Sequence, residues 1–505
     1  MASYNSIGTY SAVSSYPSFK GLMQYGDGIN TDPRYAVDAV NVETVGGVLQ
    51  PAAACVLLAP KLAQPIKTLA RLYRRWYTGT DNREVLVAAS GGKLYYMLPG
   101  ASSWTQLAFP AGVTAYQSDV WSWVAYEINP EGSEASVDVL LLSNALDGMV
   151  MVRGDNLTVS VVSTPKKFGV IARYAERIWG GAITEDPDML VYSAPYDPTD
   201  WAANVEIPED GAGDINQPSW DGDSFTALHA FGSQLIAFKK TRVWRILGTD
   251  PGEYTFKEQY GGGAPFAGTI AVDVERILML TRQGVQAYDG LAVSAYQQEY
   301  CKAIWERMNA DALDGASAVF WRGKYYCAIP MDGSEINNAV IIYNTLDGTW
   351  LLRNDVSVER FLGTQETLYF TSATTPGRIW EWRENSWETG CTAVDGARWV
   401  TPWNDLGYKQ SNKGGFEVYL LCEAQGAPVQ LRVTVQTEKK EAKTKVYTVQ
   451  PLSAQEMANG KEYRQKRMHF GGAGRRFRLL IESAPASPPW RLSGGITVVS
   501  ELDPD

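Results

Sequence analysis

The sequence offers few residues for acid–base or metal chemistry, and its only histidines are His229 and His469. His229 lies in the largely apolar run of residues 224–230, which favours a packed position inside a strand over a catalytic base. His469 follows the polar stretch 464–467, which favours an exposed position. Neither belongs to a His-Glu-x-x-His or Ser-His-Asp arrangement. We therefore predict that the protein is not an enzyme.

Three other segments resemble ligand sites only superficially. Gly261-Gly262-Gly263 is not followed by Gly-Lys-Ser/Thr, so it favours a crossing between sheets over a phosphate-binding loop. The acidic residues at 185–188 fit no calcium-loop spacing and favour a solvated turn. Asp347-Gly348 predicts a hairpin turn, since a sialidase-type Asp box spaces these residues differently. We expect no cofactor and no bound metal.

The five cysteines are odd in number and show no Cys-x-x-Cys spacing, which disfavours both a disulfide framework and a zinc site. Small buried apolar positions in a reducing compartment are the expected alternative. The cysteines are Cys55, Cys301, Cys327, Cys391 and Cys422.

A basic cluster near the C-terminus is the most unusual charge feature. Solvated strand edges explain such charges in most proteins. The sharper hypothesis is a subunit-docking face for an acidic neighbour, because the chain is acidic elsewhere. The cluster consists of Lys461, Arg464, Lys466, Arg467, Arg475, Arg476 and Arg478.

Overall charge limits the possible partners. The 505 residues include 45 Lys and Arg against 56 Asp and Glu, a net charge of −11. This balance disfavours a dedicated nucleic-acid binder, which needs a basic surface. It suits either ordinary solubility or a surface past which DNA slides without binding. The N-terminus lacks the pattern of a signal peptide, and no apolar run is long enough to predict a membrane span.

Apolar strands, aromatic strands and glycine turns recur between residues 67 and 390 with a period of roughly 40 residues. Apolar runs joined by Asp-Gly or Gly-Gly are strong hairpin signals. We count seven such units and predict an all-β chain with a β-propeller of six to eight blades. Residues 301–308 show helical spacing, which predicts one short helix between blades.

The composition changes near Trp399. From there to the end the sequence has 15 Lys and Arg against 11 Asp and Glu, and its strands alternate apolar and polar residues. Regular strands with one apolar face predict a β-sandwich packed against the propeller. The predicted organisation is an N-terminal arm with lead-in strands (1–66), the β-propeller (67–398) and a β-sandwich docking domain (399–505).

Several short segments together resemble a family. They are residues 19–22, 39–42, 46–51, 177–180, 190–201 and 235–248. They are similar to segments of the propeller-bearing tail nozzle or tail hub proteins of short-tailed, podovirus-type bacteriophages. The resemblance covers most of the chain, and its motifs are structural rather than catalytic.

The resemblance implies a viral structural protein of the phage tail, in a ring of six copies, a hexamer, at the distal end of the tail tube. Such a ring retains packaged DNA until DNA ejection and carries fibres or a plug. The implied partners are sister subunits, a tail tube or adaptor protein and a fibre or plug protein, with transient passage of DNA. The implied localisation is the virion, assembled in the host cytoplasm. A receptor- or glycan-binding tail propeller is the alternative, and a glycan-degrading enzyme is a third.

Overall fold

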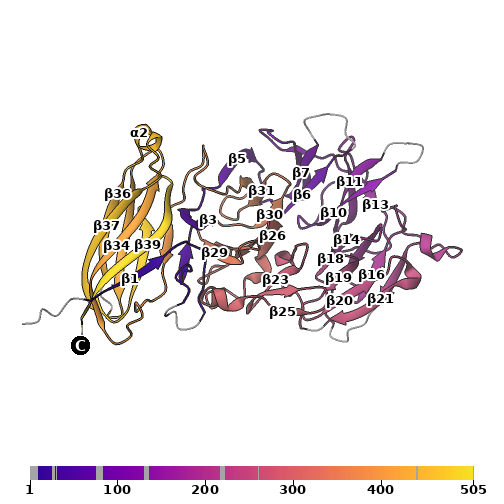
Figure 1. Cartoon of the computed structure of the whole chain (residues 1–505). Helices are drawn as coiled ribbons and strands as arrows, with labels where there is room; N and C mark the ends of the chain where they lie inside the picture. The colour runs from indigo at the N-terminus through magenta and orange to yellow at the C-terminus, as the bar shows by residue number, and fades with distance from the viewer. Residues whose placement is uncertain are drawn as a thin grey trace, which may run out of the picture.

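The computed structural model describes residues 10–25, 29, 31–75, 83–129, 136–216, 222–259, 261–439 and 442–503. Figure 1 shows two bodies side by side along one axis: a broad body of small sheets, and a tall body of long strands that contains most of the C-terminal chain. Strands dominate throughout, and the helices are single turns. The helices are η1 (Pro208–Asp210), η2 (Pro251–Glu253), η3 (Ala267–Thr269), η4 (Gln298–Cys301), α1 (Lys302–Trp305), η5 (Leu313–Gly315) and α2 (Ala454–Ala458).

The broad body is a β-propeller of seven four-stranded antiparallel blades. Six blades are separate sheets, and the sixth along the chain continues into a larger sheet. Blade 1 consists of β6 (Thr68–Tyr73), β7 (Glu84–Ser90), β8 (Lys93–Met97) and β9 (Thr105–Gln106), and blade 2 of β10 (Ser122–Ile128), β11 (Val137–Asn144), β12 (Gly148–Arg153) and β13 (Val159–Val162). Blade 3 consists of β14 (Val170–Tyr174), β15 (Arg177–Gly181), β16 (Met189–Tyr192) and β17 (Gly213–Asn216). Blade 4 consists of β18 (Ala227–Phe231), β19 (Gln234–Phe238), β20 (Val243–Leu247) and β21 (Thr255–Gln259).

Blades 5 to 7 complete the ring. Blade 5 consists of β22 (Ala271–Val272), β23 (Ile277–Thr281), β24 (Gly284–Tyr288) and β25 (Val293–Ala295). Blade 6 consists of β26 (Ser317–Trp321), β27 (Lys324–Ile329), β28 (Ala339–Asn344) and β29 (Thr349–Arg353). Blade 7 consists of β30 (Arg360–Gly363), β31 (Leu368–Thr371), β32 (Arg378–Glu381) and β5 (Val56–Lys61). The first strand of blade 7 contacts the first strand of blade 1, so the ring is closed.

The tall body is a β-sandwich of two sheets. One has the order β3-β4-β39-β34-β37 with β1 also paired to β39, and the other contains β2-β33-β38-β35-β36. Its strands are β1 (Tyr10–Tyr16), β2 (Asp38–Val40), β3 (Val42–Val45), β4 (Val48–Pro51), β33 (Arg398–Val400), β34 (Asn412–Ala424), β35 (Val429–Thr437), β36 (Ala442–Val449), β37 (Arg464–Gly474), β38 (Phe477–Ser483) and β39 (Trp490–Asp503). The predicted all-β class, with a propeller of six to eight blades and a C-terminal sandwich, is confirmed.

The N-terminal chain is divided between the two bodies. Strands β1 to β4 belong to the sandwich sheets, while β5 is the outer strand of blade 7, antiparallel to β32. Residues 1–66 are therefore not a separate structural unit, because their described strands complete the sheets of both other parts. The sequence showed these strands as apolar runs, but it held no local signal for partners more than 300 residues away.

Sheet pairing and one shared core join the bodies. β2 pairs in parallel with β29 of blade 6 and antiparallel with β33 of the sandwich, so one nine-stranded sheet runs through both. Phe19 packs edge-on against Trp399 at 5.3 Å between ring centroids, and the Leu22 amide donates to the Trp350 carbonyl at 2.8 Å. Because all four side chains are almost fully buried, hydrophobic burial supports this joint.

The end of β5 is held by a glycine turn that precedes β32. The Leu62 amide donates to the Gly377 carbonyl at 2.9 Å, and Gly377 has φ +74°. A Cβ at this position would overlap the Leu62 carbonyl oxygen. Gly333, in the β27–β28 turn, has φ +79° and open space around its missing Cβ.

We expect Gly377→Ala to destabilise the protein more than Gly333→Ala. Both substitutions incur the backbone strain of about 1–2 kcal/mol for a left-handed residue, but only Gly377→Ala also displaces the blade closure, at a further ~1–3 kcal/mol. Urea unfolding of both variants measures the difference. Equal loss in the two variants would contradict this role of the turn.

Candidate interaction surfaces

The predicted docking residues are spread over the sandwich rather than gathered in one patch, and four of them lie at opposite ends of β37. Lys461 and Arg464 lie at its start, and Arg475 and Arg476 follow its end. At about 3.3 Å per residue, these ends are roughly 30 Å apart. Lys466 lies between them and is half-buried.

At the start of β37, both basic side chains bind one carboxylate. The ammonium of Lys461 lies 2.9 Å from Glu456 Oε1, and the Arg464 guanidinium lies 2.7 Å from Glu456 Oε2. The Ser453 amide also donates to this carboxylate in the capping box of α2. These donors lower the pKa of Glu456 to about 2, so the group stays ionised. The charges of Lys461 and Arg464 are thus partly neutralised within the chain.

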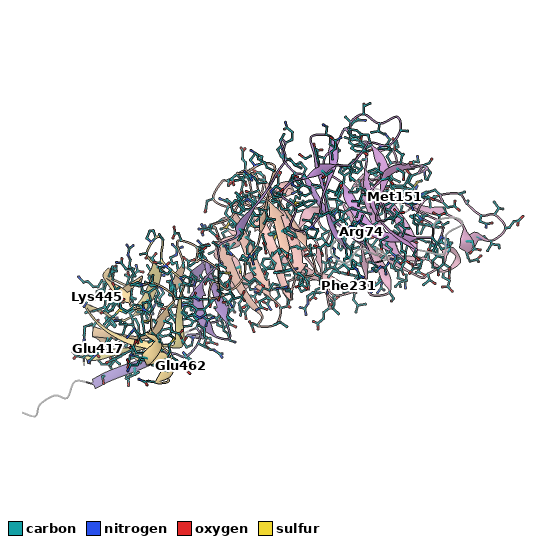
Figure 2. All side chains as sticks on the ribbon, turned by 90° about the horizontal axis from the view of Figure 1, so that it is seen from above. Arg74, Met151, Phe231, Glu417, Lys445 and Glu462 are labelled. Carbon is teal, nitrogen blue, oxygen red and sulfur yellow. The ribbon has the colours of Figure 1, made fainter. Side chains whose placement is uncertain are left out.

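Arg467 belongs to a cross-strand cluster on the outer face of the sandwich. Its guanidinium lies 2.7 Å from Glu417 Oε1, and the Tyr419 hydroxyl donates to Glu417 Oε2 at 2.6 Å. His469 Nδ1 lies 3.1 Å from the same carboxylate, and its side chain is 62% exposed. The Arg467 hydrogen bond is the main reason that the pKa of Glu417 falls to about 2. Figure 2 shows Glu417 and Lys445 at the sandwich end of the molecule.

The other basic residues have separate environments. The backbone amides of Arg475 and Arg476 donate to the Glu438 carboxylate at 2.6 and 2.9 Å, so both side chains extend from a fixed turn. Arg478 lies on the opposite sheet. Its guanidinium carbon is 4.7 Å from the centroid of the Trp403 ring, and its Nε donates to Gln436 Oε1 at 2.8 Å.

Blade 3 carries a long loop, and the segment 190–201 named from the sequence covers only its first half. Residues 193–212, here the blade 3 loop, connect β16 to β17. Blade 3 stands at the end of the propeller away from the sandwich (Figure 1). The loop exposes large apolar side chains: Tyr196 is 73%, Val205 92% and Ile207 50% exposed. Long loops in compact proteins are usually functional, and exposed apolar groups mark contact sites.

A buried arginine fixes both ends of the blade 3 loop. Arg177 on β15 is 1% exposed. Its guanidinium donates to the carbonyls of Ser193 at 2.8 Å, Gly211 at 2.6 Å and Glu209. These acceptors are all carbonyl oxygens, so their hydrogen bonds must offset the desolvation of the guanidinium charge. The loop is therefore held in one conformation although most of its residues are exposed.

The blade 3 loop is also strongly acidic. Between Arg177 and Lys239 the sequence holds 11 Asp and Glu and no Lys or Arg. Glu206, Glu209 and Asp210 lie in its exposed part. The predicted solvated turn at 185–188 has cation partners: Asp186 pairs with Lys166 at 2.6 Å, and Asp188 pairs with Lys239. This long acidic stretch without Lys or Arg is evident in the amino-acid sequence, and it is the signal by which the loop could have been predicted.

A polar cluster lies between β3 and blades 6 and 7. Glu384 accepts hydrogen bonds from the ammonium of Lys324 and from the Tyr326 hydroxyl, the latter at 2.7 Å. Glu43 accepts from the Asn385 amide at 2.8 Å, beside a cavity of about 230 Å³. Burial raises the pKa of the Glu43 carboxyl. The cluster connects the sandwich hairpin to the propeller through hydrogen bonds.

The residues with potential for chemistry occupy separate places. His229 lies on β18, as predicted, beside an open cavity of about 720 Å³ lined by the inner strands of blades 2 to 4, and burial lowers the pKa of its imidazole to about 4. Gly261 to Gly263 link blade 4 to blade 5, which confirms the predicted crossing. All five cysteines are free thiols.

Across the described ranges, no group of three or more His, Cys, Asp or Glu side chains is placed to hold a metal ion. Within the same ranges, no helix has the length and apolar character needed to cross a membrane.

Comparison with known proteins identifies no family for this chain: no family model matches it, and no curated protein matches it. Among solved structures, it is similar to the Pan2 WD40 domain of Neurospora crassa, at 10% identity and a TM-score of 0.31, over 64% of this chain and 90% of that one.

Two other solved structures show likeness at the same level. PorZ of the Porphyromonas gingivalis type-IX secretion system matches at 12% identity and a TM-score of 0.36, over 82% of this chain and 46% of that one. BBS1N, solved in complex with ARL6DN, matches at 11% identity and a TM-score of 0.31, over 72% and 98%. Likeness at this level carries no argument about function.

We expect Arg177→Gln to release the blade 3 loop, because three carbonyls lose a charged donor. The free energy of unfolding should fall by about 3 kcal/mol, and amide hydrogen exchange should accelerate in residues 193–212. Arg173→Gln on the same blade is the control, since Arg173 pairs with Glu176 at the surface, with its side chain 40% exposed. Unchanged exchange in the Arg177 variant would refute the anchoring role.

The Glu43 carboxyl should make stability depend on pH. Its raised pKa means that the folded state binds the proton more tightly than the unfolded state does. Stability from this group is therefore present at low pH and is lost as pH rises from the ordinary glutamate pKa to the raised one. We expect Glu43→Gln to become progressively more stable than the parent over that range. A difference independent of pH in parallel urea titrations would contradict it.

Proposed function

We propose that the chain is a virion structural protein: a nozzle or hub subunit of a short-tailed phage tail, without catalytic activity. In this proposal it forms a ring, of six copies by the family resemblance, at the distal end of the tail tube. The ring retains packaged DNA and is the attachment platform for fibres or a plug. Subunits assemble in the host cytoplasm and function in the virion.

One observation carries the proposal: two of the segments that resemble the phage family lie in the joint between the two bodies and at the start of the blade 3 loop. Residues 19–22 lie in the joint between sandwich and propeller, where a Cβ on Gly21 would come within 2.6 Å of the Trp350 carbonyl oxygen. Residues 190–201 lead from β16 into the anchored blade 3 loop. The resemblance therefore falls on a joint between the two bodies and on an exposed, anchored loop rather than on a catalytic site, which supports assembly as the task.

Charge distribution supports a contact between copies. Residues 399–505 carry 15 basic against 11 acidic residues, whereas residues 1–398 carry 30 against 45. The acidic loop and the basic sandwich lie at opposite ends of the long axis (Figure 1). A head-to-tail contact between such unlike surfaces is heterologous, and heterologous contacts close into rings when the rotation permits. Complementary charge also guides the association.

The acidic charge of the assembled chain fits a conduit for DNA. Phosphates bind surfaces rich in Lys and Arg, and a net charge of −11 opposes such binding. In this proposal, DNA passes through the ring without specific contacts, and the geometry of the ring rather than a chemical step provides the function.

Quantitative mass spectrometry of purified particles tests the proposal. We expect six copies of this chain for every twelve copies of the portal protein. A larger multiple of three would indicate a fibre or receptor-binding protein. Absence of the chain from particles would overturn the structural role.

A surface variant tests the contact itself. We expect Val205→Lys, which places a positive charge on the blade 3 loop opposite the basic sandwich of the neighbour, to reduce incorporation into particles at least tenfold, since like charges brought together in a contact are costly. Val274→Lys is the matched control, because Val274 is 93% exposed in a turn of blade 5. Equal incorporation of both variants would exclude the loop from the subunit contact.

A further inference from the structure

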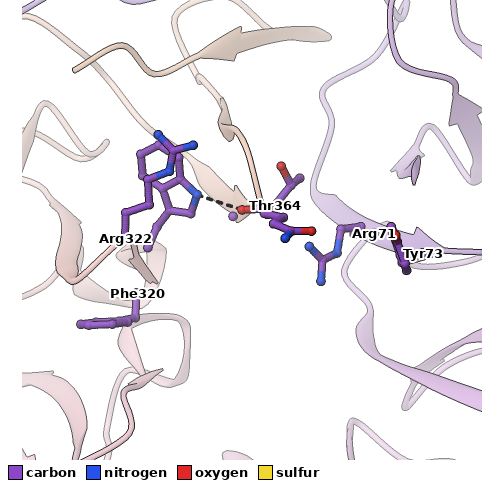
Figure 3. A pocket seen from close by; sticks show the side chains of 8 residues that line it. Arg71, Tyr73, Phe320, Arg322 and Thr364 are labelled. Carbon is purple, nitrogen blue, oxygen red and sulfur yellow. Dashed lines mark hydrogen bonds between the residues drawn. The ribbon is translucent and has the colours of Figure 1, made fainter. Parts of the chain in front are cut away.

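A pocket of about 490 Å³ opens among blades 6, 7 and 1, where their innermost strands end (Figure 3). Its lining includes Arg71 and Tyr73 from β6, Phe320 and Trp321 from β26, and the turn after β30. Two guanidinium groups and three aromatic rings thus converge from blades that are distant in sequence. The volume lies within the range of small-ligand sites.

Arg71 is the cationic group of this pocket. It is half-buried, and within the described part of the chain its guanidinium makes no hydrogen bond or salt bridge. In Figure 3 its side chain extends from β6 toward Thr364. The Glu84 carboxyl lies close enough to Arg71 to sense its charge. Burial raises the pKa of Glu84, and the positive charge of Arg71 opposes that rise. A partly desolvated guanidinium that no hydrogen bond holds favours binding of an anion.

The opposite wall is aromatic and rigid. Trp321 Nε1 donates to the Thr364 carbonyl at 2.8 Å, and the Arg322 guanidinium lies 4.5 Å from the centroid of the Trp321 ring. Arg322 also binds the Glu366 carboxylate at 3.3 Å, which neutralises part of its charge at the rim. On the Arg71 side of the pocket, Tyr73 of β6 is 39% exposed. The wall therefore offers apolar ring faces beside a single strong anion site.

We propose that this pocket binds an acidic sugar residue of a glycan. A sugar carboxylate pairs with the Arg71 guanidinium, whose planar fork fits two oxygens at once. The apolar face of the sugar ring packs on the aromatic ring of Tyr73, which lies beside Arg71 on β6. The side-chain amide of Gln365, which also lines the pocket, provides a donor and an acceptor for sugar hydroxyls. Nucleic acid would also offer anions and rings, but the net charge of −11 opposes a polyanion.

This inference is independent of the proposed place in the tail, because it concerns a site within one propeller. Isothermal titration calorimetry of the full-length chain tests it with two acidic probes, tetragalacturonate and sialyllactose. Their neutral counterparts are methyl-esterified tetragalacturonate and lactose. We expect at least one acidic probe to bind about tenfold or more tightly than its neutral counterpart, a difference of about 1.4 kcal/mol.

The variants locate the site. Arg71→Gln should lower the affinity for that probe about tenfold. Arg282→Gln should leave it unchanged, because Arg282 is 58% exposed and lies on blade 5. The proposal is overturned if neither acidic probe binds, if neutral probes bind as well, or if Arg71→Gln has no effect. Tighter binding of a thymidine oligonucleotide would instead assign the pocket to single-stranded nucleic acid.

Discussion

Unpaired strand edges are the constraint on which the rest of this structure depends. A four-stranded blade leaves a row of backbone N–H and C=O groups at its outer edge, which is a liability for any sheet protein. In this chain the N-terminal strands pair with two such edges: β5 with blade 7 and β2 with blade 6. The first pairing closes the ring, and the second fixes the sandwich to it. Both bodies therefore depend on contacts between residues far apart in sequence.

Two buried arginines illustrate different uses of a desolvated charge. Arg353 binds the Asp355 carboxylate with distances of 2.8 and 2.5 Å, and its guanidinium lies 4.5 Å from the centroid of the Trp382 ring. This ion pair stays inside the body of the propeller. Arg177 instead donates to carbonyls of the blade 3 loop, so its burial fixes the shape of an exposed surface. A loop ordered before contact loses less conformational entropy on binding.

The fold could be predicted from sequence to the extent that its signals were local. Asp-Gly turns such as Asp347-Gly348 and aromatic strands repeat along the chain, and they indicated a propeller of about seven blades. The one expected helix near residue 301 is present as η4 and α1. Alternation of apolar residues indicated the sandwich strands. The assignment of β1 to β5 to sheets of other parts was not predictable, since pairing partners leave no mark in a single sequence.

Surface features were harder to predict than the fold. The basic residues near Arg464 and those near Arg476 are close in sequence, but the length of β37 separates the two groups in space. The Glu456 carboxylate binds the Arg464 guanidinium, and the Glu438 carboxylate accepts from the Arg476 backbone amide. The pocket at Arg71 could not be foreseen, because it combines three blades. The acidic blade 3 loop was visible as a long stretch without Lys or Arg. Its meaning required the position of Arg177 in the fold.

The central claim is that this chain assembles into a ring at the distal tail through its two charged ends. A cryo-electron microscopy reconstruction of the tail of intact particles tests it most directly. The account predicts a closed ring of propeller-and-sandwich subunits at the tip, with each blade 3 loop against the sandwich of its neighbour. Density for this chain only in fibres, or no such density in the particle, would contradict it.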